Sequence, residues 1–164
     1  MDPNSLRDFM VNSPNEVKLG QSRVQRLGNV VVRLILRSPL HRILSGKLLI
    51  ITVIGRKTGR IYQNPVAYVR HEDHLLIGTS AGWRRNLRVG EPVRIRLRGA
   101  NLDAEWEVVT AEGPAAEFYR VILEHNPTHG KFAGIALEPD GSVNREDLRR
   151  ALARGTAVVR LRPV

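Results

Sequence analysis

The chain has 164 residues, which suits one domain with its own hydrophobic core. Its 26 Lys and Arg against 16 Asp and Glu give a formal net charge of +10, which predicts an anionic partner such as nucleic acid, anionic lipid or a phosphorylated cofactor. It contains no cysteine, so disulfides, thiolate metal sites and cysteine nucleophiles are excluded.

The first twenty residues are polar, and we expect a loose lead-in over 1–20 before a single domain over 21–164. The lead-in lacks the basic and apolar regions of a signal peptide, and apolar runs elsewhere are too short to span a bilayer as a helix. These features predict a cytoplasmic protein. From Ser22, apolar residues recur at helical spacing with arginines between them, which predicts a basic amphipathic helix ending near Ser38–Pro39.

Three short apolar segments follow, joined by connections of hairpin length. Residues 47–54 are rich in β-branched side chains and almost continuously hydrophobic, which predicts a strand buried on both faces. Residues 61–70 predict a second strand, in which Pro65 indicates a bulge or a sheet edge. With a third strand over 74–80, these segments predict an antiparallel three-strand meander.

The second half mixes strand and helix patterns. In 93–97 apolar residues alternate with arginines, so this strand is expected to have one buried face and one wet, basic face. Asn144 is the expected N-cap of a helix that ends before Gly155. The other expected elements are a short helix over 83–89, a strand over 102–110, a helix over 112–125, a loop-rich stretch over 126–143 and a last strand over 156–164. This order predicts an α+β fold, an antiparallel barrel of about six strands with helices packed outside it.

Residues 55–60, GRKTGR, place three positive charges and two glycines between two apolar strands. The segment lacks the Lys-Ser/Thr ending of a nucleotide phosphate loop. Glycines at these positions allow backbone N–H groups to converge on an anion, and the intervening side chains add charge and a hydroxyl. The segment is interpreted as an anion-binding turn, with a plain solvated hairpin turn as the alternative.

Residues 48–97 combine this turn with N-P at 64–65, G-T-S at 78–80 and W-x-x-N-L at 83–87. In this combination the chain resembles the deazaflavin-dependent nitroreductase family, oxidoreductases built on a flavin-like split β-barrel. The resemblance implies coenzyme F420, a deazaflavin with a phosphate and a polyglutamate tail, and hydride transfer to a quinone, nitroaromatic or other conjugated organic acceptor. Because such a cofactor carries the redox chemistry itself, neither a catalytic triad nor a metal ligand is required, and we assign none.

The resemblance also implies a set of cofactor-binding residues. Arg56 and Lys57 would hold the phosphate, and Thr58 and Gly59 would shape the turn. The expected contacts to the deazaflavin ring are Asn64, Pro65, Gly78, Thr79 and Ser80. Trp83 and Asn86 would close the site from the short helix. A lone tryptophan on a short helix is equally suited to anchoring the core.

The residues leave alternatives open for the ligand. FMN could occupy the same barrel, or the protein could carry F420 without turnover. The net charge and the basic helix would also suit a nucleic-acid or membrane-surface module. Nucleic acid is not the expected partner, since aromatic residues make up only 5% of the chain and do not alternate with basic ones.

Two further expectations concern proton transfer and assembly. The five histidines lack metal-ligand spacing, and His125 and His129, flanking Asn126–Pro127, are the candidates to protonate an acceptor. Split barrels of this kind often pair as homodimers, and a lipid quinone as acceptor would be compatible with peripheral membrane contact.

Overall fold

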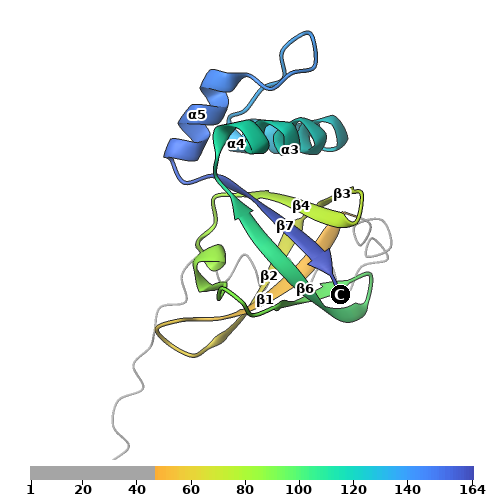
Figure 1. Ribbon diagram of the computed structural model, residues 1–164, viewed down its shortest axis with the longest axis vertical. Helices are drawn as coiled ribbons and strands as arrows, with labels where there is room; N and C mark the ends of the chain where they lie inside the picture. Colours follow the sequence, from red (N-terminus) through yellow and green to blue (C-terminus); the bar gives the residue numbers. More distant parts are fainter. Residues whose placement is uncertain (1–46) are drawn as a thin grey trace, which may run out of the picture.

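The structure, a computed structural model, describes residues 47–164. Within this range a curled antiparallel sheet forms the body of the molecule, and the α-helices gather at one end of it (Figure 1). The strands are β1 (Leu48–Ile54), β2 (Ile61–Ala67), β3 (Val69–His71), β4 (His74–Thr79), β5 (Val93–Leu97), β6 (Ala100–Val109) and β7 (Ala157–Pro163). The helices are the 3₁₀-helix η1 (Gly82–Asn86), α3 (Glu112–His125), α4 (Pro127–Ala133) and α5 (Arg145–Ala153). The expected lead-in over 1–20 and the expected basic helix that follows it lie outside the described residues.

The sheet is a split barrel with strand order β2-β1-β5-β6-β7-β4-β3, which confirms the expected α+β barrel and gives it seven strands. The chain passes from one edge of the sheet to the other at Tyr68, so the single strand expected over 61–70 is two strands. The expected three-strand meander is wrong for the same reason, because β2 pairs with β1 but not with β4. Pro65 lies on an edge strand, as a residue without an N–H donor should.

The edge strands of the sheet are β2 and the short β3, and beyond the residues that pair with β3 the open side of β4 approaches β2 across a gap, here called the split. The chain reverses in the β3–β4 hairpin after crossing at Tyr68, so β4 runs back antiparallel to β2. The carboxyl end of β4 therefore lies toward the amino end of β2, where the GRKTGR turn enters. This topology brings the GRKTGR turn and the carboxyl end of β4, which are separated in the sequence, to the same end of the barrel.

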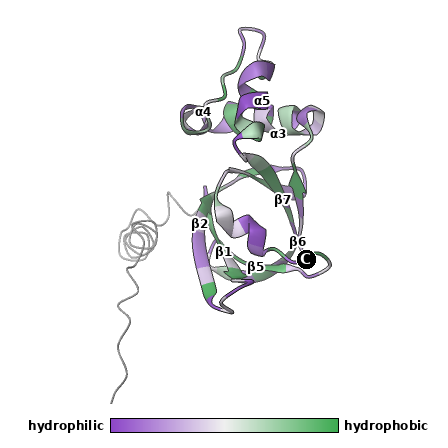
Figure 2. Cartoon of the chain, turned by 90° about the vertical axis from the view of Figure 1, so that its left-hand side faces the viewer, coloured by the Kyte–Doolittle hydropathy of each residue, from purple (hydrophilic) through white to green (hydrophobic). Residues whose placement is uncertain are grey.

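The barrel interior and the layer under the helices are separate hydrophobic cores. Alternate residues of β1, including Ile51, point into the barrel while the others are only half-buried, so the expectation that both faces are buried is wrong. The expected alternation in β5 is confirmed, with arginines on its exposed face. Trp83 is buried in the barrel core, as the anchoring interpretation expects. Figure 2 shows the resulting contrast between hydrophobic β7 and largely hydrophilic β2.

Two local expectations are corrected by the structure. The stretch over 126–143, expected to be loop, contains α4, which is short, begins with a proline and includes a glycine. Packing explains the glycine inside this helix, because a Cβ on Gly130 would lie 2.6 Å from the carbonyl oxygen of Ile135. The short helix expected over 83–89 is the single 3₁₀ segment η1, which ends at Asn86.

The predicted N-cap of α5 is confirmed, since Asn144 Oδ1 accepts a hydrogen bond of 2.8 Å from the backbone N–H of Asp147. Replacing Asn144 with Ala leaves this N–H without its partner, and we expect the free energy of unfolding to fall by about 1 kcal/mol. Urea denaturation measures the change. Unaltered stability in Asn144→Ala would show that the cap contributes nothing here.

Candidate functional site

The GRKTGR turn is closed by its own backbone. The N–H of Gly55 donates to the carbonyl of Arg60, and the N–H of Gly59 donates to the carbonyl of Gly55, each at 2.8 Å. Gly59 adopts φ +64, a conformation that favours glycine. The N–H groups of Gly55 and Gly59 are therefore bonded within the turn, and the side chains of residues 56–58 and 60 face solvent. Anion binding by the turn stays a prediction.

Arg56 fastens the turn to η1. Its backbone N–H donates to Asn86 Oδ1 at 3.2 Å, and its guanidinium Nη2 donates to the carbonyl of Leu87 at 2.8 Å. Two of the sequence-predicted residues, Arg56 and Asn86, thus meet directly. Lys57 is exposed and forms no ion pair within residues 47–164, so the turn presents an unpaired cation to solvent.

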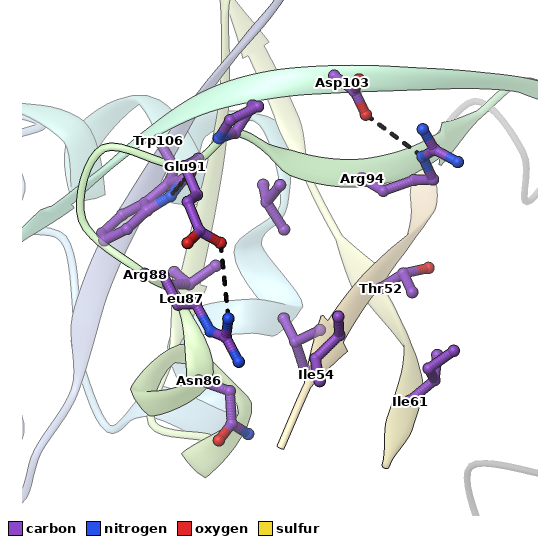
Figure 3. Close-up of a pocket in the computed structure, with 13 residues that line it drawn as sticks. Thr52, Ile54, Ile61, Asn86, Leu87, Arg88, Glu91, Arg94, Asp103 and Trp106 are labelled. Atoms are coloured by element: carbon purple, nitrogen blue, oxygen red, sulfur yellow. Dashed lines mark hydrogen bonds and ion pairs between the residues drawn. The ribbon is translucent and has the colours of Figure 1, made fainter. Parts of the chain in front are cut away.

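A pocket of about 380 Å³ lies beside this turn, in the wedge where β1 and β5 diverge. Figure 3 shows Ile54 and Ile61 on one side of it, with Asn86 and Leu87 from the η1 segment opposite. Arg88 and Glu91 form an ion pair at its rim. The pocket therefore lies between the basic turn and an apolar surface.

Asn64 and Pro65 lie on β2 at the edge of the split. Asn64 pairs with Ile51 in the register of β1 and β2, and it shares the inner face of β2 with Tyr62 and Val66, which pack on the barrel core. Its Nδ2 is buried and has no hydrogen-bond partner among residues 47–164. A buried donor without a partner is costly, by about 1–3 kcal/mol, so a ligand acceptor atom at this edge would complete it. This orphaned donor fits the carbonyl and ring-nitrogen acceptors of a deazaflavin.

A second pocket, of about 500 Å³, lies at the carboxyl end of β4. The predicted residues Gly78, Thr79 and Ser80 line it, and the helical layer supplies the rest of its wall. Those additional lining residues are Ala81, Tyr119, His129, Phe132, Ala133, Arg154 and Thr156. Its volume suits a small organic molecule, and no carboxylate is among the residues of 47–164 that line it.

Tyr119 and His129 meet β4 at Gly78. Their rings stack with centroids 5.9 Å apart, and both Tyr119 OH and His129 Nε2 are buried without a partner in the described part of the chain. A Cβ built on Gly78 would lie 2.4 Å from His129 Nε2 and 2.9 Å from Tyr119 OH, so glycine is required for this approach. Burial raises the pKa of the Tyr119 hydroxyl, which Arg84 lowers to a smaller extent, and the hydroxyl stays protonated.

Burial also lowers the pKa of His129 below its ordinary value of 6.5, because the apolar surroundings disfavour the imidazolium. The unfolded chain then binds the proton more readily than the folded one. The contribution of neutral His129 to the free energy of unfolding is therefore fully present above about pH 6.5 and is lost as the pH falls toward the folded-state pKa. We expect His129→Gln to flatten the dependence of the unfolding free energy on pH below about pH 6.5. Urea titrations at several pH values measure it, and parallel curves for both proteins would contradict this environment for His129.

Eight of the eleven predicted site residues form two groups on either side of η1, while Asn64 and Pro65 lie on β2 at the split and Trp83 lies in the barrel core. Arg56, Lys57, Thr58, Gly59 and Asn86 lie at the turn, and Gly78, Thr79 and Ser80 line the second pocket. Sequence reasoning missed Arg84 and Tyr119, because one is half of an Arg-Arg pair and the other fits the apolar spacing of a helix. Of the two candidate histidines, His129 lines the pocket, while His125 is exposed with Nδ1 2.9 Å from the carbonyl of Val121.

Residues 47–164 contain no cluster of three His, Asp or Glu side chains placed to hold a metal ion. Among the same residues, no helix combines the length and apolar character needed to cross a bilayer.

An antiparallel split barrel with a basic turn at its opening and an adjoining small-molecule pocket is the architecture of a cofactor-binding split-barrel protein. Residues 18–135 match the model of the F420H(2)-dependent quinone reductase family, and the chain belongs to that family. It is therefore an F420-dependent oxidoreductase with coenzyme F420 as its cofactor, which confirms the deazaflavin-dependent resemblance. No curated protein sequence matches the chain.

Solved structures resemble the chain at low sequence identity. A protein assigned to 5-nitroimidazole antibiotic resistance in Bacteroides thetaiotaomicron is 11% identical, with a TM-score of 0.50 over 77% of this chain and 79% of that one. An F420-H2 dependent reductase (FDR-A) is 13% identical, with a TM-score of 0.49 over 70% and 93% of the two chains. The heme storage protein HutZ from Vibrio cholerae is 17% identical, with a TM-score of 0.49 over 77% and 89%. The likeness to the Bacteroides protein supports the fold and nothing beyond it.

Proposed function

We propose that the protein reduces a quinone with reduced coenzyme F420. The observation that carries this proposal is the family match over 18–135, whose description names quinone reduction. The pocket beside Gly78 agrees with it, because the pocket is large enough for a bicyclic quinone and its described walls carry no negative charge. A nitroaromatic or another conjugated acceptor is the second candidate, since its oxygens would meet the same polar groups.

The predicted residues would bind different parts of the coenzyme, the phosphate at the turn and the ring at the split. Lys57 would hold the phosphate at the turn, with Arg56 fixing the turn and Thr58 and Gly59 giving it its shape. Asn64 would donate its free Nδ2–H to the ring at the split, beside Pro65. The remaining ring contacts would come from Thr79, Ser80 and Trp83.

Bound reduced F420 supplies a hydride, which is two electrons carried with one hydrogen nucleus. The chain's own part is to orient the acceptor and to exclude water from it. Gly78 lets Tyr119 and His129 approach the backbone of β4, so the acceptor would meet a wall of two stacked rings. His129 is neutral at neutral pH and can pass a proton to or from the acceptor through its unpartnered Nε2.

The test is the oxidation of reduced F420 by the purified protein, followed by deazaflavin fluorescence. Menadione, a nitroaromatic compound and an FMN-only reaction serve as parallel arms. We expect turnover with menadione that requires both the protein and reduced F420. Turnover of the nitroaromatic alone would replace the quinone as the acceptor, and turnover with FMN in place of F420 would overturn the cofactor assignment.

We further propose, from the family alone, a cytoplasmic enzyme that forms a homodimer. Light scattering of the purified full-length protein tests the dimer. A molar mass that corresponds to one chain would exclude it.

A further inference from the structure

Arg84, the third residue of η1, carries a positive charge that has no anionic partner within residues 47–164. Its Nη2 donates to the carbonyl of Gly155, while its Nη1 is buried without any hydrogen-bond partner in residues 47–164. None of the ion pairs formed within those residues includes Arg84. A guanidinium stays charged at any pH at which the protein is folded, so this charge cannot be removed by losing a proton.

The unpaired guanidinium lies beside other unpaired polar groups. The positive charge of Arg84 is close enough to Tyr119 to lower the pKa of its hydroxyl. Gly155, whose carbonyl accepts the hydrogen bond from Arg84, directly precedes Thr156, which lines the pocket. Arg84 Nη1, Tyr119 OH and His129 Nε2 are three of the six buried side-chain atoms without a partner in the described chain. All three belong to the same corner of the fold, between η1, α3 and α4, at the end of β4.

None of the described side chains that line this pocket carries a negative charge, and none pairs with Arg84. A buried hydrogen-bonding group costs about 1–3 kcal/mol when it is left unpaired, and a charged one costs more. The pocket of about 500 Å³ adjoins the group, and its lining side chains contain no carboxylate that could supply the missing acceptor. A ligand oxygen that carries negative charge would satisfy Arg84 and Tyr119 together.

We infer that Arg84 is a catalytic residue that, with the Tyr119 hydroxyl, binds the acceptor oxygen on which negative charge develops during reduction. This inference rests on the proposed function and adds the residue that stabilises the charge. Uptake of a hydride by a quinone makes one new bond to hydrogen and leaves one oxygen as an anion, which a proton then neutralises. The hydride and the proton together equal the two hydrogens that reduced F420 loses, so atoms and electrons balance.

The inference also defines a substrate class. Acceptors that gain an oxygen-centred charge, such as quinones, should depend on Arg84 for their rate. A molecule of the same shape that already carries an oxyanion should bind more tightly than its neutral analogue, because it supplies the missing acceptor before any reaction. The ionised form of 2-hydroxy-1,4-naphthoquinone is such a probe, and 2-methoxy-1,4-naphthoquinone is the neutral analogue.

The experiment compares Arg84→Met with Arg85→Met, its exposed neighbour on η1. Removing one preorganised donor to a developing oxyanion lowers kcat by about 10²–10³-fold in well-studied enzymes. We expect about a 10²-fold fall in kcat for menadione in Arg84→Met, with F420 affinity and the KM of menadione changed less than about threefold. Arg84→Lys should recover part of the loss, and Arg85→Met should match the wild type. Tyr119→Phe, which removes only the hydroxyl, should lower kcat by about tenfold.

A binding measurement keeps this inference separable from the proposed function. Calorimetry on the complex with oxidised F420 should show the hydroxynaphthoquinone binding at least about tenfold tighter than the methoxy analogue, and Arg84→Met should abolish that preference. Equal affinity for both compounds in the wild type, or a preference that persists in Arg84→Met, would overturn the inference. If the wild type binds the anion preferentially but turns over no quinone, the proposed function fails while anion binding by Arg84 is supported. Thermal unfolding verifies that each variant is folded, and Tyr119→Phe and Arg84→Lys decide the matter if Arg84→Met is not.

Discussion

Replacing Lys57 with Ala is expected to weaken binding of coenzyme F420 by about 10–100-fold, because one charge-assisted contact to a phosphate contributes about 1.5–3 kcal/mol. Stability should stay within about 0.5 kcal/mol of the wild type, since the side chain is exposed and forms no ion pair within residues 47–164. Fluorescence titration with F420 measures the affinity, and salt should weaken the wild type more steeply than the variant.

The controls for this prediction lie nearby. Arg96→Ala removes an exposed positive charge from the outer face of β5 and should leave F420 affinity almost unchanged. Arg56→Ala should weaken binding and also lower stability by about 1 kcal/mol, because the bond from its guanidinium to Leu87 holds the turn on η1. Equal affinities of Lys57→Ala and Arg96→Ala would contradict the turn as the phosphate site.

Replacing Gly78 with Ala is expected to lower kcat/KM for the quinone by about 10²-fold, because it would displace the wall of the pocket. The added Cβ would lie 2.4 Å from His129 Nε2 and 2.9 Å from Tyr119 OH, so α4 or the Tyr119 ring has to move. We also expect a loss of about 1–3 kcal/mol in stability from this overpacking. Steady-state kinetics and thermal unfolding measure the two effects.

Gly113→Ala is the matched control for Gly78→Ala. Gly113 lies in α3, and a Cβ there would meet no atom within 4 Å. Alanine should raise helix stability slightly and leave turnover unchanged. Wild-type activity in Gly78→Ala would show that the approach of His129 to β4 has no part in the reaction.

Much of the fold could be predicted because its signals are local. The alternation in 93–97, the Asn144 cap and the apolar spacing of α3 each depend on neighbouring residues only, and the structure confirms them. The division of 61–70 into β2 and β3 could not be read in this way. It arises because the chain must move from one sheet edge to the other, which is a property of the whole curled sheet and not of the segment.

The candidate site shows the same division. The turn, the N-P pair and the G-T-S segment were predicted from short motifs, and the structure places them around η1 and the split. The hydrogen bonds that close the turn could not be predicted, because the carbonyls of Arg60 and Gly55 come within reach of the glycine N–H groups only in the folded turn. Arg84 and Tyr119 carried no signal, since what distinguishes them is the absence of a partner among the described residues.

The proposed function depends most on coenzyme F420 binding at the turn and the split. Titration of the full-length protein with F420, followed by deazaflavin fluorescence, tests this most directly. We predict saturable binding with a dissociation constant at or below the order of 10 μM, unaffected by an excess of FMN and weakened in Lys57→Ala. Absence of binding at tens of micromolar F420, or displacement of F420 by FMN, would contradict the account.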